Sequence, residues 1–511
     1  MQTVSSVAAG NHRIDALLGP QAWAPGAITY SFPGASSVWS TSTGEYAAGV
    51  SEPFTGFSAL DTLQQSAVVA ALAAWTAVAN IDFTAVADDA TGQGTLRFAW
   101  SLMDTGLQSE AYQPDPLNKG GDVWLNSAAQ WSGMAPGSYG YSTLLHEIGH
   151  ALGLKDSALG AVTMPPAQDG YATTLMSGNA LASLAGSWVD FEPTTPMVGD
   201  IAAIQHLYGA DTRHHAGDDV YAFEQGQNYF QTLWDAGGTD TIQWNGLTQG
   251  ATIDLREGAF SSLGKPLVYW ASDYSSSQTD PWTVAIALGT RIEKAVGGSA
   301  GDELIGNDLG DLFMGRGGND TIRGGAGLDT ALYASPRAAV TTDRLVGGAL
   351  QVSGPEGVDT LHGVERAQFS DGALGFDIDG LGGQAYRLYR AAFDRAPDGG
   401  GLGFWMYHLD RGFNFVEAAN NFLNSAEFRL MYGENPTNEQ FVRLLYVHVN
   451  HREPEPAGNQ FWLDAMANRD GAFGHAWTRG EILLQFSESV ENKANVVGVI
   501  EDGFDYLPYL P

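Results

Sequence analysis

The chain has 511 residues, with 58 acidic and 24 basic side chains and no cysteine, and its formal net charge at pH 7 is −34. Such a charge repels the phosphates of nucleic acids and of anionic membranes, and it favours the binding of cations. Without disulfide bonds, a secreted chain must be stabilised by its core and by metal. The length suffices for two or three domains, and no apolar run is long enough for a membrane span, so we expect no nucleic-acid partner and no membrane insertion.

Hydrophobic patterning in the first part of the chain predicts a mixture of strands and helices. Apolar residues alternate near residues 27–32, which indicates a strand. A helical pattern runs from about residue 58 to 79, and its expected inner side is made of Leu60, Leu63, Val68, Leu72 and Trp75. Residues 95–100 and 121–126 are predicted to form further strands.

The run from His146 to Asp156 carries the strongest chemical signal. On a helix, side chains four residues apart share a face, so His146 and His150 can each offer a ring nitrogen to one zinc ion. Glu147 lies one residue around the helix, where it is placed to take a proton from a water at an open zinc position. Gly153 can adopt the left-handed conformation that ends a helix and turns Asp156 back toward the metal. The run therefore predicts a hydrolytic zinc site.

The third zinc ligand has more than one candidate in the sequence. We predict Asp156, whose carboxylate would be a harder, charge-neutralising ligand. One alternative makes Asp156 a solvated turn residue, with water or another side chain completing the site. His206, His214 and His215 are then the reserve ligands. The other alternative is a helix with two surface histidines and no metal.

Residues 146–156 resemble the zinc-binding helix of the metzincin peptidases, which usually have a third histidine at the position of Asp156. The run 174–177, Thr-Leu-Met-Ser, is similar to the metzincin Met-turn, which implies that Met176 packs beneath the imidazoles. Without the helix upstream, such a methionine would be read as ordinary core packing. In the serralysin branch a tyrosine two residues after this methionine assists at the metal, and this chain has Gly178 there.

Three further stretches, residues 28–32, 79–83 and 196–210, extend the resemblance to the serralysins, which are secreted bacterial zinc endopeptidases, over roughly residues 13–376. The resemblance implies an α+β metzincin catalytic domain, and it speaks against His206 as a ligand. In this family the strand that matches residues 121–126 is a sheet edge that pairs with extended substrate, so Val123 and Trp124 are the expected edge residues. Recognition of main chain by such a ladder implies broad specificity for protein or peptide substrates.

A nine-residue repeat begins at Gly297 and reads GGSAGDELI, GNDLGDLFM, GRGGNDTIR and GGAGLDTAL. Its sixth place is always aspartate: Asp302, Asp311, Asp320 and Asp329. Its eighth place is expected to point inward: Leu304, Phe313, Ile322 and Ala331. Aspartates and turn carbonyls of stacked coils bind calcium, so the repeat predicts a parallel β-roll that folds only when calcium is abundant. A disordered glycine-rich linker is the alternative.

Residues 234–241 resemble an isolated half-turn of the same design, in which Asp235 and Asp240 are candidate calcium ligands. Gly-Asp turns are also ordinary hairpin chemistry, and this alternative stays open. Glu293 leads into the repeat as in the serralysins, and we include it among the candidates. The N-terminus lacks the basic start and apolar stretch of a signal peptide. Proteins with such RTX repeats leave Gram-negative cells by type I secretion, so the resemblance implies an extracellular location.

Beyond about residue 377 the sequence becomes helical and aromatic-rich, and it contains an internal duplication. Five residues recur after 57 positions, from Tyr389, Pro397, Gly401, Phe404 and Trp405 to Tyr446, Pro454, Gly458, Phe461 and Trp462. Phe422, Ser425 and Glu427 recur after 64 positions, which implies a seven-residue insertion. The segment resembles a family of unknown function. We expect two similar helical units whose aromatic residues form the core, with a ligand-binding platform as the alternative.

These observations predict three domains: a zinc metallopeptidase domain at residues 1–212, a calcium-binding RTX β-roll at 213–376, and an all-α domain at 377–511. The predicted function is a secreted zinc endopeptidase that uses one zinc ion, Glu147 as general base, and several structural calcium ions. The helical domain is a candidate for attachment to a cell surface, a glycan or a matrix protein. The alternative is a calcium-dependent adhesion protein whose peptidase-like domain has little or no turnover.

Overall fold

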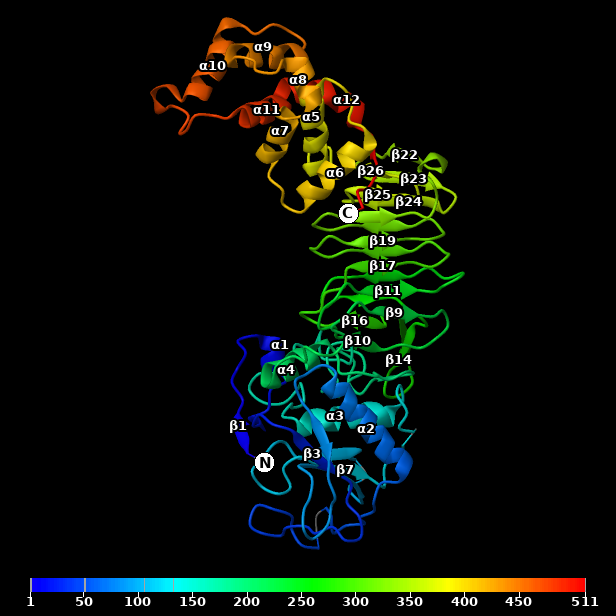
Figure 1. The fold of residues 1–511 in the computed structure, drawn as a ribbon. Helices are drawn as coiled ribbons and strands as arrows, with labels where there is room; N and C mark the ends of the chain where they lie inside the picture. The colour runs from blue at the N-terminus through cyan, green and yellow to red at the C-terminus, as the bar shows by residue number, and fades with distance from the viewer. Residues whose placement is uncertain (1, 50–51, 105, 132, 511) are drawn as a thin grey trace. The chain divides into compact units, whose positions relative to one another are not determined.

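The structure is a computed structural model that describes residues 2–49, 52–104, 106–131 and 133–510 (Figure 1). The chain divides into two compact units, residues 1–299 with 305–307, and residues 300–304 with 308–511. Each unit is described by itself below. In the described part of the chain, no helix combines the length and the apolar character that crossing a lipid bilayer requires. The predicted boundaries at residues 212 and 376 stay a prediction.

The first unit contains a five-stranded sheet. Its strands are β3 (Ile28–Ser31), β4 (Phe83–Ala85), β5 (Leu96–Ser101), β6 (Ser109–Ala111) and β7 (Asp122–Asn126), in the order β4-β3-β5-β7-β6. All neighbours are parallel except β6 and β7, which pair antiparallel with Ser109 opposite Leu125. The strands predicted near residues 27–32, 95–100 and 121–126 are therefore confirmed.

The prediction that residues 121–126 form the edge of this sheet is wrong. Strand β7 lies between β5 and β6, and Val123 and Trp124 are 0% and 1% exposed. A strand with neighbours on both sides has its main-chain groups already paired, so it cannot form a ladder with substrate. The edge strand on this side is β6, whose three residues are half-buried.

Four helices accompany this sheet: α1 (His12–Asp15), α2 (Thr62–Thr76), α3 (Tyr139–Ala151) and α4 (Val198–Tyr208) (Figure 1). Helix α2 begins with a capping box formed by Asp61 and Gln64. Its inner residues are buried as predicted, with one exception. Leu63 is 82% exposed, because it lies five residues before Val68 and so on another side of the helix.

The remaining strands of the first unit are short. They are β1 (Thr3–Ser5), β2 (Gln21–Trp23), β8 (Trp188–Val189), β9 (Val220–Phe223), β10 (Gln231–Leu233), β11 (Thr241–Trp244), β12 (Thr252–Asp254), β13 (Phe260–Ser261), β14 (Leu267–Trp270), β15 (Ser277–Asp280), β16 (Val284–Ile286) and β17 (Lys294–Val296). Strands β9, β11 and β17 pair in parallel, as do β10 and β16. The segment after α4 thus contains stacked parallel strands, together with the antiparallel pairs β13–β16 and β14–β15.

The nine-residue repeats form short strands, most of them in the second unit: β18 (Glu303–Ile305), β19 (Leu312–Met314), β20 (Thr321–Arg323) and β21 (Thr330–Leu332). Parallel pairing joins β19 to β21, and it continues to β25 (Arg366–Gln368). Strand β20 pairs in parallel with β24 (Gly357–His362). The four residues in the eighth place are at most 1% exposed, which confirms that they point inward. Closure of these strands into a roll stays a prediction.

Other elements complete this part of the second unit. They are the 3-10 helix η1 (Arg337–Ala339) and the strands β22 (Thr341–Arg344), β23 (Leu350–Gly354), β26 (Ala373–Gly375) and β27 (Phe504–Tyr506). Antiparallel pairs join β22 to β23, β23 to β24, β25 to β26, and β26 to β27. Strand β27 comes from the end of the chain and therefore ties the helical segment to the strands of the same unit.

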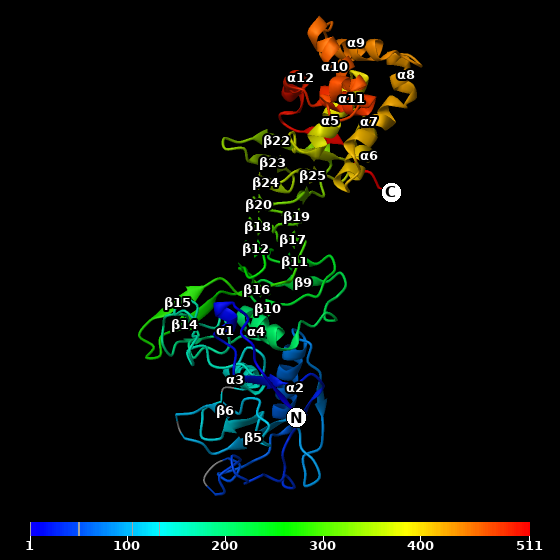
Figure 2. The same ribbon diagram turned by 90° about the vertical axis from the view of Figure 1, so that its left-hand side faces the viewer.

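The helices of the second unit repeat as the sequence predicts (Figure 2). The first set is α5 (Leu381–Phe393), α6 (Gly399–Asp410), α7 (Phe415–Leu423) and α8 (Ala426–Tyr432), and the second is α9 (Asn438–Val449), α10 (Pro456–Ala467), α11 (Arg479–Ser487) and α12 (Val490–Ile500). Helices α9 and α10 begin 57 residues after α5 and α6, whereas α11 and α12 begin 64 residues after α7 and α8. The insertion lies between α10 and α11 and contains the 3-10 helix η2 (Arg469–Gly471).

Matched side chains make matched contacts in the two halves. Tyr389 and Phe422 have ring centroids 5.3 Å apart, and their counterparts Tyr446 and Phe486 are 5.1 Å apart. All four side chains are buried. This supports the interpretation that the recurring aromatic residues form the core, which leaves these rings no free surface for a ligand platform.

Candidate metal centre

Helix α3 and the turn after it position the predicted zinc ligands. Ser138 caps the helix by accepting a hydrogen bond from the main-chain N–H of Tyr141 at 3.4 Å. Gly153, just after the helix, has φ +108°, and a Cβ there would lie 2.5 Å from the carbonyl oxygen of Gln21. The turn therefore requires glycine, as predicted. It returns the chain so that Asp156 lies against α3.

Three possible ligand atoms converge at this point. Nε2 of His146 is 3.6 Å and Nε2 of His150 is 3.3 Å from Oδ1 of Asp156. The three atoms lie within 4.8 Å of one another. Two imidazole nitrogens and one carboxylate oxygen form a ligand set that suits zinc and leaves a fourth position open. The residues present therefore fit the metal that the sequence predicts.

The main chain fixes the orientation of both imidazoles. Nδ1 of His146 is 2.8 Å from the carbonyl oxygen of Leu175, and Nδ1 of His150 is 3.0 Å from that of Leu154. Because a carbonyl can only accept, each Nδ1 carries a proton and each Nε2 keeps its electron pair for a metal. Burial lowers the pKa of His146 and so favours the neutral ring. Burial also lowers the pKa of His150, but the hydrogen bond with Asp156 and the charge of Glu147 outweigh it and raise that pKa overall.

Glu147 is buried beside these ligands, and its two carboxylate oxygens differ. Oε1 accepts a hydrogen bond from the hydroxyl of Ser109 at 2.6 Å. Oε2 is buried and has no hydrogen-bond partner among the described residues. Ser109 lies on the edge strand β6, so this hydrogen bond links the carboxylate to the edge of the sheet. Ser109 has no motif of its own, and the sequence analysis missed it.

Asp200 on α4 holds the turn below the histidines. Its Oδ2 accepts hydrogen bonds from the main-chain N–H groups of Leu175 at 2.8 Å and of Met197 at 2.9 Å, and its Oδ1 accepts one from the hydroxyl of Thr174. Burial raises the pKa of Asp200 to about 6, although these hydrogen bonds oppose the shift. Since the carbonyl of Leu175 contacts Nδ1 of His146, Asp200 supports the orientation of that imidazole through the chain. The sequence analysis did not identify this residue.

Met176 lies against α3, as the resemblance to a Met-turn implies. It is 0% exposed, and a Cβ on Gly149 would lie 2.8 Å from its sulfur. Gly149 thus lets the sulfur approach the helix closely. Gly178 lies at a cavity of about 210 Å³ that is also lined by Tyr139, His146, Glu147 and Tyr171. A Cβ at Gly178 would meet nothing within 4 Å, so the place of the family's phenol is open space.

The reserve histidines do not join this cluster. Nε2 of His206 is 2.7 Å from the carbonyl oxygen of Val7. Nδ1 of His215 is 3.1 Å from Oδ1 of Asp219, and these two residues form a separate possible metal cluster with Asp235. The rings of His214 and His215 contact each other at 4.2 Å between centroids. Of the candidate third ligands among the described residues, Asp156 is the one that lies with His146 and His150.

The predicted calcium ligands form rows in which each main-chain N–H donates to the next carboxylate. In the first carboxylate row, Asp302 donates to Oδ1 of Asp320 at 2.8 Å, and Asp320 donates to Oδ1 of Asp359 at 2.9 Å. Oδ2 of Asp320 is buried without a hydrogen-bond partner among the described residues. A Cβ on Gly315 would lie 2.0 Å from this oxygen, so glycine makes room around it. Burial raises the pKa of Asp320 to about 7.

The second carboxylate row repeats this arrangement nine residues further on. Asp311 donates to Oδ1 of Asp329 at 2.8 Å, and Asp329 donates to Oε2 of Glu365 at 2.9 Å. Oδ2 of Asp329 is also buried without a hydrogen-bond partner in the described part of the chain. Burial raises the pKa of Asp329 to about 7. Asp359 and Glu365, which end the two rows, lie beyond the repeats, and the sequence analysis missed both.

The third carboxylate row lies in the first unit. Asp219 donates to Oδ1 of Asp240 at 2.8 Å, and Asp240 donates to Oε2 of Glu293 at 2.8 Å. Oδ2 of Asp240 is buried without a hydrogen-bond partner among the residues described. Asp235 accepts hydrogen bonds from the hydroxyl of Tyr221 at 2.6 Å and from the main-chain N–H of Gly237 at 2.7 Å. Each of the three rows thus has a buried carboxylate oxygen without a hydrogen-bond partner among the described residues. Carboxylate oxygens are ligands that calcium prefers.

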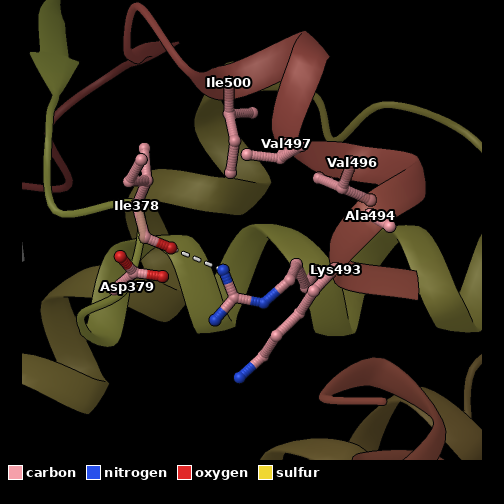
Figure 3. Close-up of a pocket in the computed structure, with 8 residues that line it drawn as sticks. Ile378, Asp379, Lys493, Ala494, Val496, Val497 and Ile500 are labelled. Carbon is pink, nitrogen blue, oxygen red and sulfur yellow. Dashed lines mark hydrogen bonds between the residues drawn. The ribbon is translucent and has the colours of Figure 1, made fainter. Parts of the chain in front are cut away.

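The helical segment of the second unit has a cavity of about 250 Å³ between α5 and α12 (Figure 3). Its walls are apolar except for Asp379, Arg387 and Lys493. Arg387 donates to the carbonyl of Ile378 and pairs with Glu488, with N–O distances of 2.8 and 3.0 Å. Lys493 pairs with the same glutamate at 3.0 Å. Both basic side chains are thus already neutralised within the fold.

Three family models match the chain. The model described as Matrixin matches residues 57–174, that described as Peptidase M10 serralysin C terminal matches residues 200–347, and that described as Domain of unknown function (DUF4214) matches residues 419–496. The first includes the cluster on α3, and the second includes most residues of the carboxylate rows. The third lies within the duplicated helices.

Curated relatives with similar sequences are named as serralysins or as a metallopeptidase. Serralysin from Photorhabdus sp. (strain Az29) is 33% identical over 275 residues, which cover 49% of this chain and 54% of the relative. Serralysin C from Dickeya chrysanthemi is 33% identical over 276 residues, covering 49% and 54%. Metallopeptidase AprA from Pseudomonas marginalis is 32% identical over 276 residues, covering 48% and 54%. The chain thus spans about half the length of the curated relatives it matches. Over residues 57–174 and 200–347 the chain is thus similar to serralysin-like metzincins, and its helical part matches the DUF4214 model.

Proposed function

We propose that the protein is a secreted zinc-dependent endopeptidase. The observation that carries this proposal is the convergence of His146 Nε2, His150 Nε2 and Asp156 Oδ1 next to the buried carboxylate of Glu147. Asp156 is proposed as the third zinc ligand. When bound, zinc supplies a Lewis acid that acidifies water and polarises a carbonyl group. Similarity to relatives named serralysin and metallopeptidase supports the proposal.

The chain's own residues have separate tasks in this reaction. Glu147 acts as general base through Oε2, which has no other hydrogen-bond partner among the described residues. Ser109 holds the other oxygen of this carboxylate and so fixes its direction. The free side of β6 pairs with the main chain of an extended substrate, which aligns a peptide bond beside Glu147. Main-chain recognition at this edge implies broad specificity along most of the substrate.

The carboxylate rows are proposed to bind several structural calcium ions. Oδ2 of Asp320 and Oδ2 of Asp329 are buried without a hydrogen-bond partner among the described residues, and burial raises the pKa of both carboxyl groups; a bound cation would stabilise both. Low calcium inside the cell would keep these segments unfolded until export, in keeping with the proposed type I secretion. Attachment of the helical segment to a cell surface, a glycan or a matrix protein stays a prediction.

The competing function, an adhesion protein without turnover, is not favoured. Such a protein has no need of a buried carboxylate beside three metal ligands, because an unpaired buried oxygen is costly to the fold. Glu147 has this costly arrangement in Oε2. The arrangement is expected where the oxygen takes up a proton during a reaction.

A peptidase assay with matched variants tests the proposal. Zinc-loaded protein should hydrolyse casein and lose this activity with a zinc chelator. Glu147→Gln should keep one zinc per chain and lose about 10²- to 10⁴-fold in kcat/KM. Asp156→Ala should lower the zinc content, whereas the control His206→Ala should not. Protein that holds one zinc and cleaves no polypeptide would refute the proposal, and an unchanged zinc content in Asp156→Ala would remove Asp156 from the ligands.

A further inference from the structure

A second, larger cavity adjoins the reaction centre in the first unit. It has a volume of about 610 Å³ and is lined by Gln130, Trp131, Gly137, Ser138, Tyr139, Trp188, Val189, Asp190 and Glu192. Tyr139 lines both this cavity and the smaller one that contains His146 and Glu147. The two cavities are therefore neighbours, and a substrate held at the metal site can place a side chain in the larger one.

Glu192 gives this cavity a buried negative charge. Its side chain is 5% exposed, and Oε2 accepts a hydrogen bond from the hydroxyl of Ser142 at 3.2 Å. Its main-chain N–H donates to the carbonyl of Gly137 at 3.0 Å, which fixes its place in the cavity wall. No lysine, arginine or histidine pairs with Glu192 among the described residues. Burial raises the pKa of Glu192 to about 7, as expected for a carboxylate without a countercharge.

Aromatic rings line the same cavity. Trp188 stacks on Trp270 with ring centroids 5.7 Å apart and an interplanar angle of 13°. The indole N–H of Trp188 is buried without a hydrogen-bond partner in the described part of the chain. Trp131 and Tyr139 add two further rings. Aromatic faces around a carboxylate attract cations, because the ring faces are negative.

Asp190 adds a second acidic group to the lining of the cavity. It is exposed, and its Oδ1 accepts a hydrogen bond from the main-chain N–H of Val268 at 2.8 Å. An apolar substrate side chain in this cavity would leave Glu192 buried without a countercharge, which costs binding energy. A lysine or arginine side chain would pair with Glu192 and pass along the rings with its apolar stem.

We infer that this cavity is a specificity subsite for a basic side chain, lysine or arginine, close to the scissile bond of the substrate. Glu192 is the residue that selects the charge, and Trp131, Tyr139 and Trp188 enclose the aliphatic stem. The inference rests on the proposed peptidase function and deepens it. The proposed enzyme would then select the side chain at one position of the substrate and recognise the main chain elsewhere.

Digestion of a positional peptide library tests the inference. Wild-type protein should enrich lysine and arginine at one position near the cleaved bond, by at least about tenfold over norleucine, because a charge-assisted hydrogen bond is lost with norleucine. Glu192→Gln should abolish this ratio. Trp188→Phe, which keeps a ring but removes the N–H, should retain the preference for a basic residue. The exposed Glu224→Gln, outside both cavities, is the matched control and should keep the wild-type ratio.

A binding measurement separates this inference from the proposed function. Glu147→Ala protein should bind the best library peptide at least about tenfold more tightly than its norleucine counterpart, by calorimetry, and the added change Glu192→Gln should remove the difference. Cleavage without a basic preference, a preference that survives Glu192→Gln, or equal binding of the two peptides would overturn the inference. Absence of cleavage with the binding difference intact would instead refute the proposed function alone.

Discussion

The proposed zinc ligands at α3 and the carboxylate rows arrange their charge in opposite ways. At α3 the proposed ligands are two imidazoles oriented by main-chain carbonyls, and Asp156 is the one carboxylate of the proposed set. In the rows, carboxylates follow one another, and main-chain N–H groups hold Oδ1 of Asp320 and of Asp329 while their Oδ2 atoms have no hydrogen-bond partner among the described residues. The first arrangement is complete without its ion. The second leaves buried negative charge that only a cation or a proton can neutralise.

The largest expected effect therefore comes from removing calcium. A calcium-selective chelator should unfold the carboxylate rows, because each ion at a thousandfold excess over its Kd contributes about 4 kcal/mol to stability. Circular dichroism should show loss of strand signal, with recovery after calcium is restored. Magnesium is the control cation and should restore less, since it prefers smaller octahedral sites. Strand signal that does not change with calcium would contradict the proposed role of the rows.

The pH dependence of the calcium-free protein gives the next largest effect. The pKa of Asp320 and of Asp329 is about 7 in the folded state, above the ordinary value of 3.8, so the folded state binds protons more tightly than the unfolded state. The stability that these groups contribute is present at acidic pH and is lost as the pH rises through about 7. Without calcium, the strand signal that survives in circular dichroism should therefore fall between pH 5 and pH 8, because these groups lose the protons that neutralise them. With saturating calcium this fall should disappear, because the ion replaces the protons.

Local patterns in the sequence predicted much of both regions. The spacing of His146, Glu147 and His150 needs only one turn of helix, and the nine-residue repeat places its aspartates and apolar residues by phase alone. Offsets of 57 and 64 residues likewise predicted where the duplicated helices begin. In each case the interacting groups are fixed by a short segment whose geometry follows from its own period.

The sequence did not predict features that depend on contacts between distant segments. The family resemblance assigned the edge strand to Val123 and Trp124. The sequence could not correct this assignment, because strand order in a sheet cannot be read from the pattern of one strand. Asp200 and Glu192 reach their partners across 25 and 50 residues. No motif marks such pairs. For the same reason Asp359 and Glu365, which end two carboxylate rows, lie outside the repeat that predicted the other members.

Asp200→Asn should weaken the metal cluster and leave the carboxylate rows intact. The amide cannot accept all the hydrogen bonds from Leu175, Met197 and Thr174, so the turn that holds His146 should loosen. Substitution of a residue that supports a metal ligand in this way typically lowers metal affinity by about 10- to 100-fold. Competition with a zinc chelator should show this loss. The calcium concentration at half-refolding should stay unchanged, and a shift in it would show that the two regions are coupled.

Ser109→Ala is the mildest change, and it tests whether the cluster on α3 is complete in itself. The substitution removes the hydroxyl that donates to Oε1 of Glu147 at 2.6 Å, and leaves all three proposed zinc ligands in place. We expect kcat to fall by about tenfold, in line with one lost hydrogen bond to a charged group, with KM, zinc content and Tm nearly unchanged. Ser127→Ala, at an exposed serine whose hydroxyl donates to the main chain of the same sheet at 3.1 Å, is the control. Loss of zinc in Ser109→Ala would show that the cluster depends on the edge strand, and the contrast with the carboxylate rows would then be weaker than the geometry indicates.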